Sequence, residues 1–457
     1  MTRGDVAGSR VVVLGLGITG RSVASVLAER GASVLASDAR ASADLDVADL
    51  AALGVEVETG GHDRARASLA TADLVVPSPG ISPHRGFLAE VIAAGVPVVS
   101  ELDLAVGFSD APVVAVTGTN GKTTVSLLAE RIAREDGMDA YMCGNTEVPF
   151  VAAAAEHPDA DLFVVEASSF RLAFCETFHP RVAIITNFAP DHLDWHSSVS
   201  DYRAAKARMA ARQTDGDLFV FPSSQPELSA MAPDAPTHVA FGEARDGSAA
   251  WVEGDEIIVR IGDRIVRATG VGRLAERGSH FALDAAAAAA ALVFLGVDAE
   301  PIERALRSFE VAQHRLEPVG TLNGISVIDD SVSANAHATV AAVRHVSGGR
   351  DARVVLIAGG RNKGIDLSPL ASEAPRIKAL VAIGEASDEL ADVFSATSVP
   401  VKVSGSMDEA VGLALAAAES GDVVLMSPAC ASFDMFRGYA DRGRAFREAC
   451  RAHGVTP

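Results

Sequence analysis

The stretch VVAVTGTNGKTT, residues 113–124, decides the fold of this chain. Its first four residues form an apolar run that, with Thr117, predicts a buried strand, and a helix is predicted from Val125 onward. In the loop between them, backbone N–H groups can surround an anion, Lys122 can neutralise phosphate charge, and the Thr123 hydroxyl can bind Mg²⁺. The spacing departs from GxxxxGK[ST] because position 116 is valine, so the pattern predicts a shortened phosphate loop. That loop comprises Gly118, Thr119, Asn120, Gly121, Lys122, Thr123 and Thr124.

Short apolar runs alternate with alanine-rich stretches on both sides of this loop. The alternation predicts βαβ units, parallel sheets and an α/β fold. The sequences Glu253-Gly254-Asp255 and Gly262-Asp263 are typical of hairpin turns, so the central sheet is predicted to be mixed. Three blocks follow, at residues 1–110, 111–312 and 313–457. Strands are predicted near residues 11–14, 33–37, 74–76, 96–99, 113–117, 162–165, 183–186, 325–328, 354–357, 380–383, 401–403 and 423–426.

Composition and charge exclude several classes of protein. Of 457 residues, 49% are hydrophobic and 22% charged, which excludes a disordered or fibrous chain. The net charge of −21 makes general nucleic-acid binding unfavourable. The four cysteines lie far apart without metal-ligand spacing, and the longest apolar run, residues 285–296, is too short to span a bilayer. The N-terminus lacks a signal-peptide core. We therefore expect a cytoplasmic protein with reduced thiols and no membrane insertion. We also expect a monomer.

A second glycine-rich motif lies near the N-terminus. The sequence GLGITG, residues 15–20, follows a predicted strand, and Asp38 ends the next one. Such glycines allow close approach of the backbone, and the following helix N-terminus attracts a diphosphate, while Asp38 can bind ribose or uridine hydroxyls. Alone, the motif leaves a nicotinamide oxidoreductase or a structural turn open. The phosphate loop favours an enzyme that uses a nucleoside triphosphate, because hydride transfer does not need one.

Three further groups of the central block are candidates for catalysis. Glu166 lies in VVEASSF, His192 in TNFAPDHLDWH and Lys206 in DYRAAKARM. A carboxylate and an imidazole near a phosphate loop suit Mg²⁺ that bridges phosphate oxygens. Each also has a structural explanation, as a helix-capping anion, a turn residue and a solvent-facing lysine respectively. Their combination with Lys122 favours the catalytic interpretation.

Taken in order, TGTNGKTT, VEASSF, TNFAPDHLDWH and YRAAK resemble the Mur ligase family, the ATP-dependent amide ligases of peptidoglycan precursor assembly. SPACASFDMF and RGYADRGRAF, residues 427–446, resemble the branch that joins glutamate to UDP-N-acetylmuramoyl-L-alanine. The likeness extends to GLGITG, SPGISP and SELDL in the first block, and so covers essentially the whole chain. It implies a Rossmann-like UDP-binding domain, a central P-loop ATPase-like domain with a mixed sheet, and a C-terminal Rossmann-like domain. It also implies ATP, two Mg²⁺ ions and an acyl-phosphate intermediate.

The resemblance assigns roles to residues at matching positions. Lys122, Glu166, His192 and Lys206 are implied as catalytic. Nucleotide contacts are implied for the phosphate loop with Arg315, Asp330 and Lys363. Contacts to the UDP-linked substrate are implied for Ile18, Thr19, Asp38, Arg40, Gly80, Asn145 and Ser168. Amino-acid contacts are implied for Ser432 and Tyr439. Metal-associated positions are Thr123, Glu166, His192 and Lys206, the last as a carbamate that supports a second Mg²⁺.

The chain departs from the family pattern on the amino-acid side. The family's D-S-K-A-T-N is DSVSAN at residues 330–335, so the lysine and threonine that hold glutamate become Val332 and Ala334. A hydrogen bond to a charged group contributes about 1.5–3 kcal/mol, so affinity falls unless Ser333 or Arg171 compensates. D-glutamate is expected, while L-glutamate, a glutamate analogue or a paralogue without ligase activity stay open. Further departures are Arg171 for glutamine, HFALD at 280–284 for H-N-x-x-N, and GNTE at 144–147 for G-N-I-G.

Overall fold

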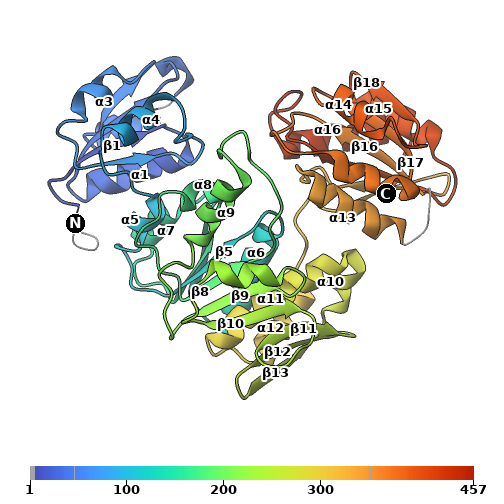
Figure 1. The fold of residues 1–457 in the computed structure, drawn as a ribbon, viewed down its shortest axis with the longest axis horizontal. Helices are drawn as coiled ribbons and strands as arrows, with labels where there is room; N and C mark the ends of the chain where they lie inside the picture. The colour runs from blue at the N-terminus through green and yellow to red at the C-terminus, as the bar shows by residue number, and fades with distance from the viewer. Residues whose placement is uncertain (1–5, 46, 349–352) are drawn as a thin grey trace. The chain divides into compact units, whose positions relative to one another are not determined.

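The computed structural model describes residues 6–45, 47–348 and 353–457, and the chain forms two compact units (Figure 1). The first unit runs to Phe188 and includes Trp195–Glu276 and His280–Phe309. The second comprises Ala189–Asp194, Arg277–Ser279 and Glu310–Pro457. Two short segments of the central sequence therefore belong with the C-terminal residues.

A four-stranded parallel sheet, in the order β3-β2-β1-β4, begins the first unit. Val11 and Val13 of β1 join one apolar core with residues of α1, whereas Val12 and Leu14 join another with residues of α4. Both faces of the sheet are therefore covered by helices, as alternating side chains of a strand require. The elements are β1 (Arg10–Leu14), α1 (Ile18–Glu29), β2 (Ser33–Asp38), η1 (Ser42–Asp44), α2 (Ala48–Ala52), β3 (Glu56–Thr59), α3 (Asp63–Ser68), β4 (Leu74–Pro77), α4 (Gly86–Ala93) and α5 (Glu101–Ala105).

The strand predicted at residues 96–99 is wrong. This segment makes only an isolated bridge between Val98 and Val75. Pro97 accepts a hydrogen bond from the Val75 N–H but has no N–H of its own to donate, which limits pairing with the sheet.

The rest of the first unit is built on a nine-stranded mixed sheet, in the order β13-β12-β11-β10-β9-β8-β5-β7-β6. The strands β11, β12 and β13 pair antiparallel through the two predicted hairpins, and the other neighbouring strands are parallel. Its strands are β5 (Val113–Thr117), β6 (Ala140–Gly144), β7 (Leu162–Glu166), β8 (Val182–Ile185), β9 (Leu218–Pro222), β10 (Thr237–Gly242), β11 (Ala249–Glu253), β12 (Glu256–Ile261) and β13 (Arg264–Thr269). The accompanying helices are α6 (Lys122–Glu135), α7 (Phe150–Glu156), α8 (Ser169–Leu172), α9 (Val199–Ala207), η2 (Pro226–Met231), α10 (Gly272–Arg277), α11 (Ser279–Phe294) and α12 (Ala299–Ser308).

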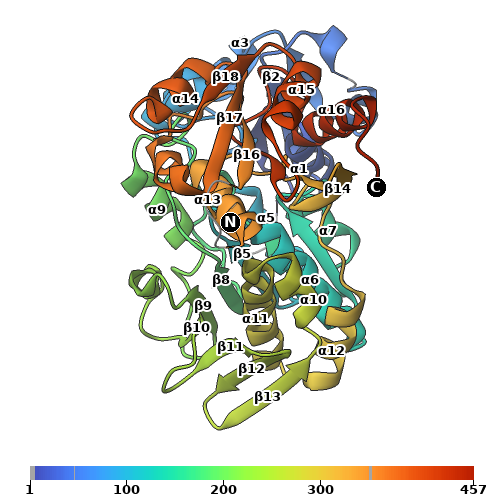
Figure 2. The same ribbon diagram turned by 90° about the vertical axis from the view of Figure 1, so that its right-hand side faces the viewer.

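The second unit contains a six-stranded sheet in the order β14-β15-β19-β16-β17-β18, in which only β14 is antiparallel (Figure 2). Helices α15 and α16 pack together against it, and α13 packs with η3 and α14 against the sheet as a second group. The elements are β14 (Glu317–Leu322), β15 (Ile325–Asp329), α13 (Ala336–Ser347), β16 (Val354–Gly359), η3 (Ser368–Arg376), β17 (Ile377–Ile383), α14 (Ser387–Phe394), β18 (Val401–Ser404), α15 (Met407–Ala417), β19 (Val423–Ala429) and α16 (Tyr439–Ala452).

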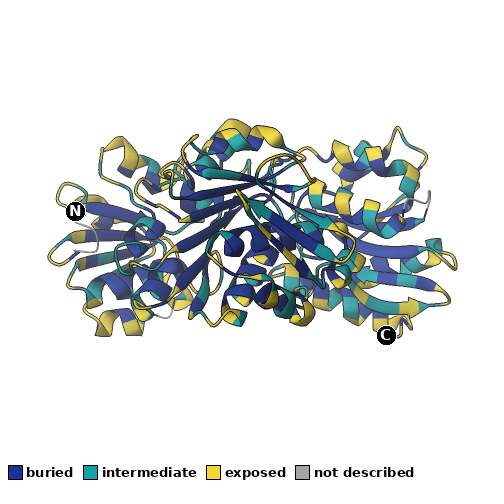
Figure 3. Ribbon diagram, turned by 90° about the horizontal axis from the view of Figure 1, so that it is seen from below, coloured by how far each residue is buried: buried dark blue, intermediate teal, exposed yellow. Residues whose placement is uncertain are grey.

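Burial follows this layering: the central strands are buried, and exposed residues gather on helices and loops (Figure 3). The predicted α/β class with three sheets, the central one mixed, is confirmed. Across the described parts of the chain, no helix is both long enough and apolar enough to cross a membrane.

Candidate active site

The phosphate loop joins β5, near the middle of the nine-stranded sheet, to α6. Gly121 caps α6 with φ +86°, and a Cβ there would lie 2.7 Å from Asp284 Oδ1. Gly118 has φ +145°, and a Cβ there would lie 1.9 Å from Thr186 Oγ1. The N–H groups of Thr119 and Asn120 donate to the backbone and side-chain oxygens of Asn187 at 3.1 and 3.0 Å. Glycine is therefore required at both positions, and the segment after β8 holds the loop in place.

Two lysines converge on one carbonyl of this loop. Lys122 Nζ donates to Gly118 O at 3.0 Å and to Thr119 O at 2.9 Å. Lys206, on α9 and 2% exposed, donates from Nζ to Gly118 O at 2.8 Å. The structural explanation of Lys206 as a solvent-facing lysine is therefore wrong, because its side chain is buried against the loop. Two ammonium groups beside the N-terminus of the 14-residue helix α6 favour an anionic ligand.

Glu166 ends β7 and is joined to two other predicted site residues. Its carboxylate, 3% exposed, accepts hydrogen bonds from Thr123 Oγ1 at 2.8 Å and from Asn145 Nδ2 at 2.9 Å. A threonine hydroxyl and a carboxylate are oxygen ligands that Mg²⁺ accepts. The structure thus brings Thr123, Glu166 and Asn145 together, although they lie 21 to 43 positions apart along the chain.

His192 belongs to the second unit, where Asp191 organises its surroundings. His192 has φ 56°, and its N–H donates to Asp191 Oδ1 at 2.7 Å. Asp191 also pairs with Lys363 Nζ at 2.5 Å and accepts from Asn335 Nδ2 at 3.1 Å. Burial alone would raise the pKa of Asp191, but the Lys363 ammonium and His192 lower it below its ordinary value. Asp191 is not among the site residues predicted from the sequence, although it lies in TNFAPDHLDWH directly before His192.

Asp330 and Arg315 also lie close together in the second unit. Asp330 is 2% exposed and accepts from Ser427 Oγ at 2.7 Å and from the Leu316 N–H at 3.2 Å. Burial raises the pKa of Asp330 to about 6, while hydrogen bonds from Ser333 and Ser427 and the charge of Arg315 oppose that rise.

The predicted amino-acid residues lie in different surroundings within the second unit. Ser432 is buried, whereas Tyr439, at the start of α16, is half exposed. Tyr439 lines a cavity of about 460 Å³ together with His314 and three arginines, Arg444, Arg447 and Arg451. Three neighbouring side chains lie close enough together to bind a metal ion: His314, Glu317 and Asp329. However, Arg447 forms ion pairs with both of these carboxylates. These three residues are therefore explained as part of an ion-pair network.

The glycine turn of the first sheet carries the predicted UDP contacts. Asp38 accepts from the Leu16 and Arg40 N–H groups at 2.7 and 2.8 Å and from Arg40 Nη2 at 2.8 Å. Burial would raise the pKa of Asp38, but these hydrogen bonds lower it to about 2, and the bond from the Arg40 guanidinium contributes most to the lowering. Ile18 is 58% exposed, Thr19 is buried, and a Cβ at Gly80 would meet open space.

Ser168 and Arg171 lie on one turn. Ser168 caps α8, and its Oγ accepts from the Arg171 N–H at 3.4 Å. The Arg171 guanidinium is buried and is bound to Glu101 and Thr19. Arg171 is therefore not a free cation for a glutamate carboxylate, and that hypothesis of compensation is wrong.

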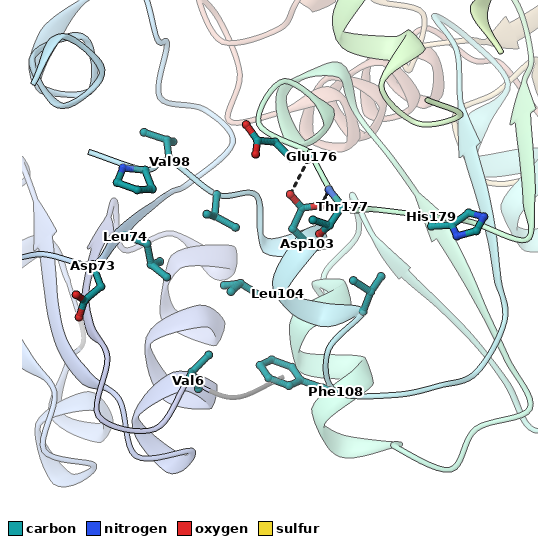
Figure 4. Close-up of a pocket in the computed structure, with 13 residues that line it drawn as sticks. Val6, Asp73, Leu74, Val98, Asp103, Leu104, Phe108, Glu176, Thr177 and His179 are labelled. Atoms are coloured by element: carbon teal, nitrogen blue, oxygen red, sulfur yellow. Dashed lines mark hydrogen bonds between the residues drawn. The ribbon is translucent and has the colours of Figure 1, made fainter. Parts of the chain in front are cut away.

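An apolar pocket of about 680 Å³ lies elsewhere in the first unit (Figure 4). Leu74, Val98, Leu104 and Phe108 line it, and Asp103 accepts hydrogen bonds from consecutive backbone N–H groups of residues 176–178. The described residues around this pocket include none of the predicted site residues.

Three family models match the chain: "Mur ligase MurD-like, N-terminal domain" over residues 9–100, "Mur ligase middle domain" over 116–292, and "Mur ligase, glutamate ligase domain" over 314–430. A UDP-N-acetylmuramoylalanine–D-glutamate ligase of Pelotomaculum thermopropionicum is 36% identical, over 97% of this chain and 98% of its own. The protein of the same name from Chlorobium phaeobacteroides is 37% identical over the same shares.

Solved structures share the fold. MurF ligase from Thermotoga maritima in complex with ADP has a TM-score of 0.59 at 16% identity, covering 99% of this chain and 97% of that one. UDP-N-acetylmuramate–alanine ligase MurC from the same organism has a TM-score of 0.57 at 18% identity, covering 97% and 99%.

Proposed function

We propose, from the premise that this chain belongs to the Mur ligase family, that it joins D-glutamate to UDP-N-acetylmuramoyl-L-alanine with conversion of ATP to ADP and phosphate. As a Mur ligase it is an ATP-dependent ligase of peptidoglycan precursor assembly. The observation that carries the proposal is the convergence of Lys122 and Lys206 on the Gly118 carbonyl. We expect the reaction to take place in the cytoplasm, where ATP and UDP-linked precursors are available.

In the proposed reaction, the alanyl carboxylate attacks the γ-phosphorus of ATP, and ADP leaves. The resulting acyl phosphate is attacked by the amine of glutamate, and the tetrahedral intermediate collapses to an amide and phosphate. Lys122 would leave its own loop carbonyls to neutralise phosphate charge, and the loop N–H groups would hold the phosphate oxygens. The exchange is favourable because a phosphate oxygen is a stronger acceptor than a neutral carbonyl.

The donor set near the loop fits Mg²⁺. Thr123 and Glu166 offer a hydroxyl and a carboxylate that already touch, and we propose His192 and a carbamylated Lys206 as further metal-associated positions. Bound Mg²⁺ would neutralise charge on the phosphate oxygens. Carbamylation would replace a cation that repels the metal with an anion that attracts it.

We assign binding of the UDP-linked substrate to residues 1–110, with Asn145 and Ser168 from the central block. ATP is assigned to residues 111–312, with Arg315, Asp330 and Lys363, and the incoming amino acid to residues 313–457. Ser432 and Tyr439 remain the proposed amino-acid contacts. No observation favours a nicotinamide oxidoreductase or L-glutamate as the substrate.

The test is phosphate release with UDP-N-acetylmuramoyl-L-alanine, ATP and a panel of amino acids that includes both glutamates. We expect release only when all three substrates are present, with D-glutamate preferred. Release with L-glutamate but not D-glutamate would contradict the stereochemical part. ATP hydrolysis that ignores the UDP-linked substrate would contradict the ligase reaction.

A further inference from the structure

A buried ion pair lies where four helices of the first unit meet. Arg171 Nη1 donates to Glu101 Oε1, and the two side chains are 5% and 2% exposed. Glu101 begins α5, and its Oε2 accepts from the Val151 N–H of α7 at 2.9 Å. Ser100, the N-cap of α5, donates from Oγ to Arg171 O at 2.7 Å. Because removing two charges from water is costly, such a pair is poorly explained by stability alone.

The other end of the guanidinium reaches a predicted substrate contact. Arg171 Nη2 donates to Thr19 Oγ1 at 2.9 Å, and Thr19 is the second residue of α1, directly after the glycine turn. A hydroxyl has one proton and two acceptor positions. Because Arg171 occupies an acceptor position of Thr19, the Thr19 proton is left to donate in another direction.

The space in front of α1 can take an anion. No side chain caps this helix, and a Cβ built at Gly17 or Gly80 would meet nothing within 4 Å. The N-terminus of α1 carries partial positive charge and unsatisfied N–H groups. A Thr19 hydroxyl that already accepts from Arg171 would add a donor to this set.

Arg171 also links this end of the substrate site to the other. Its backbone N–H donates to Ser168 Oγ and its side chain donates to Thr19 Oγ1, and both residues are proposed contacts to the UDP-linked substrate. A single residue of α8 therefore connects two groups that are 149 positions apart in the sequence.

We propose that Arg171 is a positioning residue for the UDP-linked substrate. It directs the Thr19 hydroxyl proton towards the diphosphate and holds the start of α1 at a fixed distance from α8. It acts through Thr19 and Ser168 rather than by touching the substrate. This inference rests on the proposed function, because it assumes that the substrate carries a UDP group.

The experiment measures UDP binding by calorimetry and steady-state kinetics with the full chain. Arg171→Gln combined with Glu101→Gln removes both charges, so neither is left buried alone. We expect this pair to weaken UDP binding and to raise the KM for the UDP-linked substrate about tenfold, the effect of one lost hydrogen bond. The kcat and the KM for ATP should change less than twofold. Arg171→Lys should recover part of the loss. Arg212→Met serves as the arginine control, because Arg212 Nε donates to the Glu176 carbonyl, which is not a proposed substrate contact.

A thermodynamic cycle with Thr19→Val separates positioning from packing. If Arg171 acts through Thr19, adding Thr19→Val to the Arg171→Gln/Glu101→Gln variant should weaken UDP binding little more than either change does alone. Fully multiplicative losses, or equal changes in kcat and in the KM for ATP, would overturn the proposal. So would unchanged UDP binding in the neutral pair. If that pair does not fold, Arg171→Lys and Thr19→Val apply the same criteria. Failure of the wild-type chain to bind UDP would instead contradict the proposed function.

Discussion

Two loops of this chain each follow a strand that has a parallel neighbour, and each leads into a helix. Residues 118–121 join β5 to α6 in the first unit, and residues 330–335 join β15 to α13 in the second. The first contains two glycines with positive φ, and Lys122, directly after it, donates to two of its carbonyls. The second contains no glycine, and its polar side chains are bound to groups outside the loop, such as the Ser427 hydroxyl and the Ala338 N–H.

This difference determines what each loop can offer a ligand. Lys122 Nζ donates to neutral carbonyls, and a phosphate oxygen can replace them as the acceptor. The first loop is therefore suited to bind an anion. In the second, Ser331 Oγ donates to Asp329 at 2.5 Å, and Asn335 caps α13 by accepting from the Ala338 N–H at 2.9 Å. Val332 and Ala334, at the partly exposed positions, offer no hydrogen bond from their side chains. If the amino acid binds to this unit as proposed, its recognition depends on side chains other than those of Val332 and Ala334.

The largest expected effect concerns the first loop. Lys122→Ala should lower kcat by about a thousandfold, because one preorganised cation at the transferring phosphoryl group is lost. UDP binding should change less than twofold, since its proposed contacts lie in or beside the first sheet and not in this loop. Phosphate release and calorimetry measure the two effects, and Lys378→Ala, which removes a lysine paired with Asp422, is the control. A loss of UDP affinity as large as the loss of rate would refute this separation.

The second prediction tests whether Lys206 acts as an anion. Lys206→Ala should lower kcat by about a hundredfold, because a proposed metal-binding group is removed. Added acetate should restore part of the activity by occupying the vacated space, whereas Lys122→Ala should not respond to acetate. Carbon-13 NMR in labelled bicarbonate should detect the carbamate. Full activity in carbon dioxide-depleted buffer, with no labelled signal, would show that Lys206 works unmodified.

The third prediction concerns Asp330 in the second loop. Its pKa is raised to about 6 by burial, whereas aspartate in an unfolded chain titrates near 3.9. The native state binds more protons between these values, so the free energy of unfolding from this group falls as pH rises from about 4 to about 6. Over this range the free energy of unfolding should fall by about 2–3 kcal/mol, and above pH 6 Asp330 should cause no further fall.

Asp330→Asn should remove this part of the pH dependence. Urea denaturation at pH 4 and pH 7, followed by circular dichroism, measures the difference between wild type and variant. Asp392→Asn changes an exposed aspartate of the same unit and should keep the wild-type slope. Identical slopes for wild type and Asp330→Asn would mean that Asp330 titrates near its ordinary value.

The smallest expected effect concerns amino-acid choice. Val332→Lys with Ala334→Thr should change the ratio of kcat/KM for D- and L-glutamate about tenfold, because one restored charge-assisted hydrogen bond is worth at least that factor. Both positions are partly exposed, so the larger side chains need not enter the core. Ser395→Thr, a similar enlargement at an exposed position of the same unit, controls for nonspecific effects. An unchanged ratio with lower activity would show that the amino acid is held by other residues.

Local patterns in the sequence determined much of this protein. The run of apolar residues before Gly118, the glycines of both nucleotide motifs and the two hairpin turns depend on contacts within a few residues, where periodicity and backbone conformation are decisive. The strand predicted at residues 96–99 does not form, because Pro97 interrupts the apolar run with a residue that has no N–H donor.

Only the tertiary structure decided which polar groups meet. Glu166 touches Thr123 and Asn145 because β6, β7 and β5 are neighbours in the sheet, and Asp191 holds Lys363 because residues 189–194 join the second unit. Arg171 binds Thr19 across 152 positions. Residue types suggest such partners, but strand order and helix packing select them, since a buried charge must be matched by whichever group the fold brings within reach.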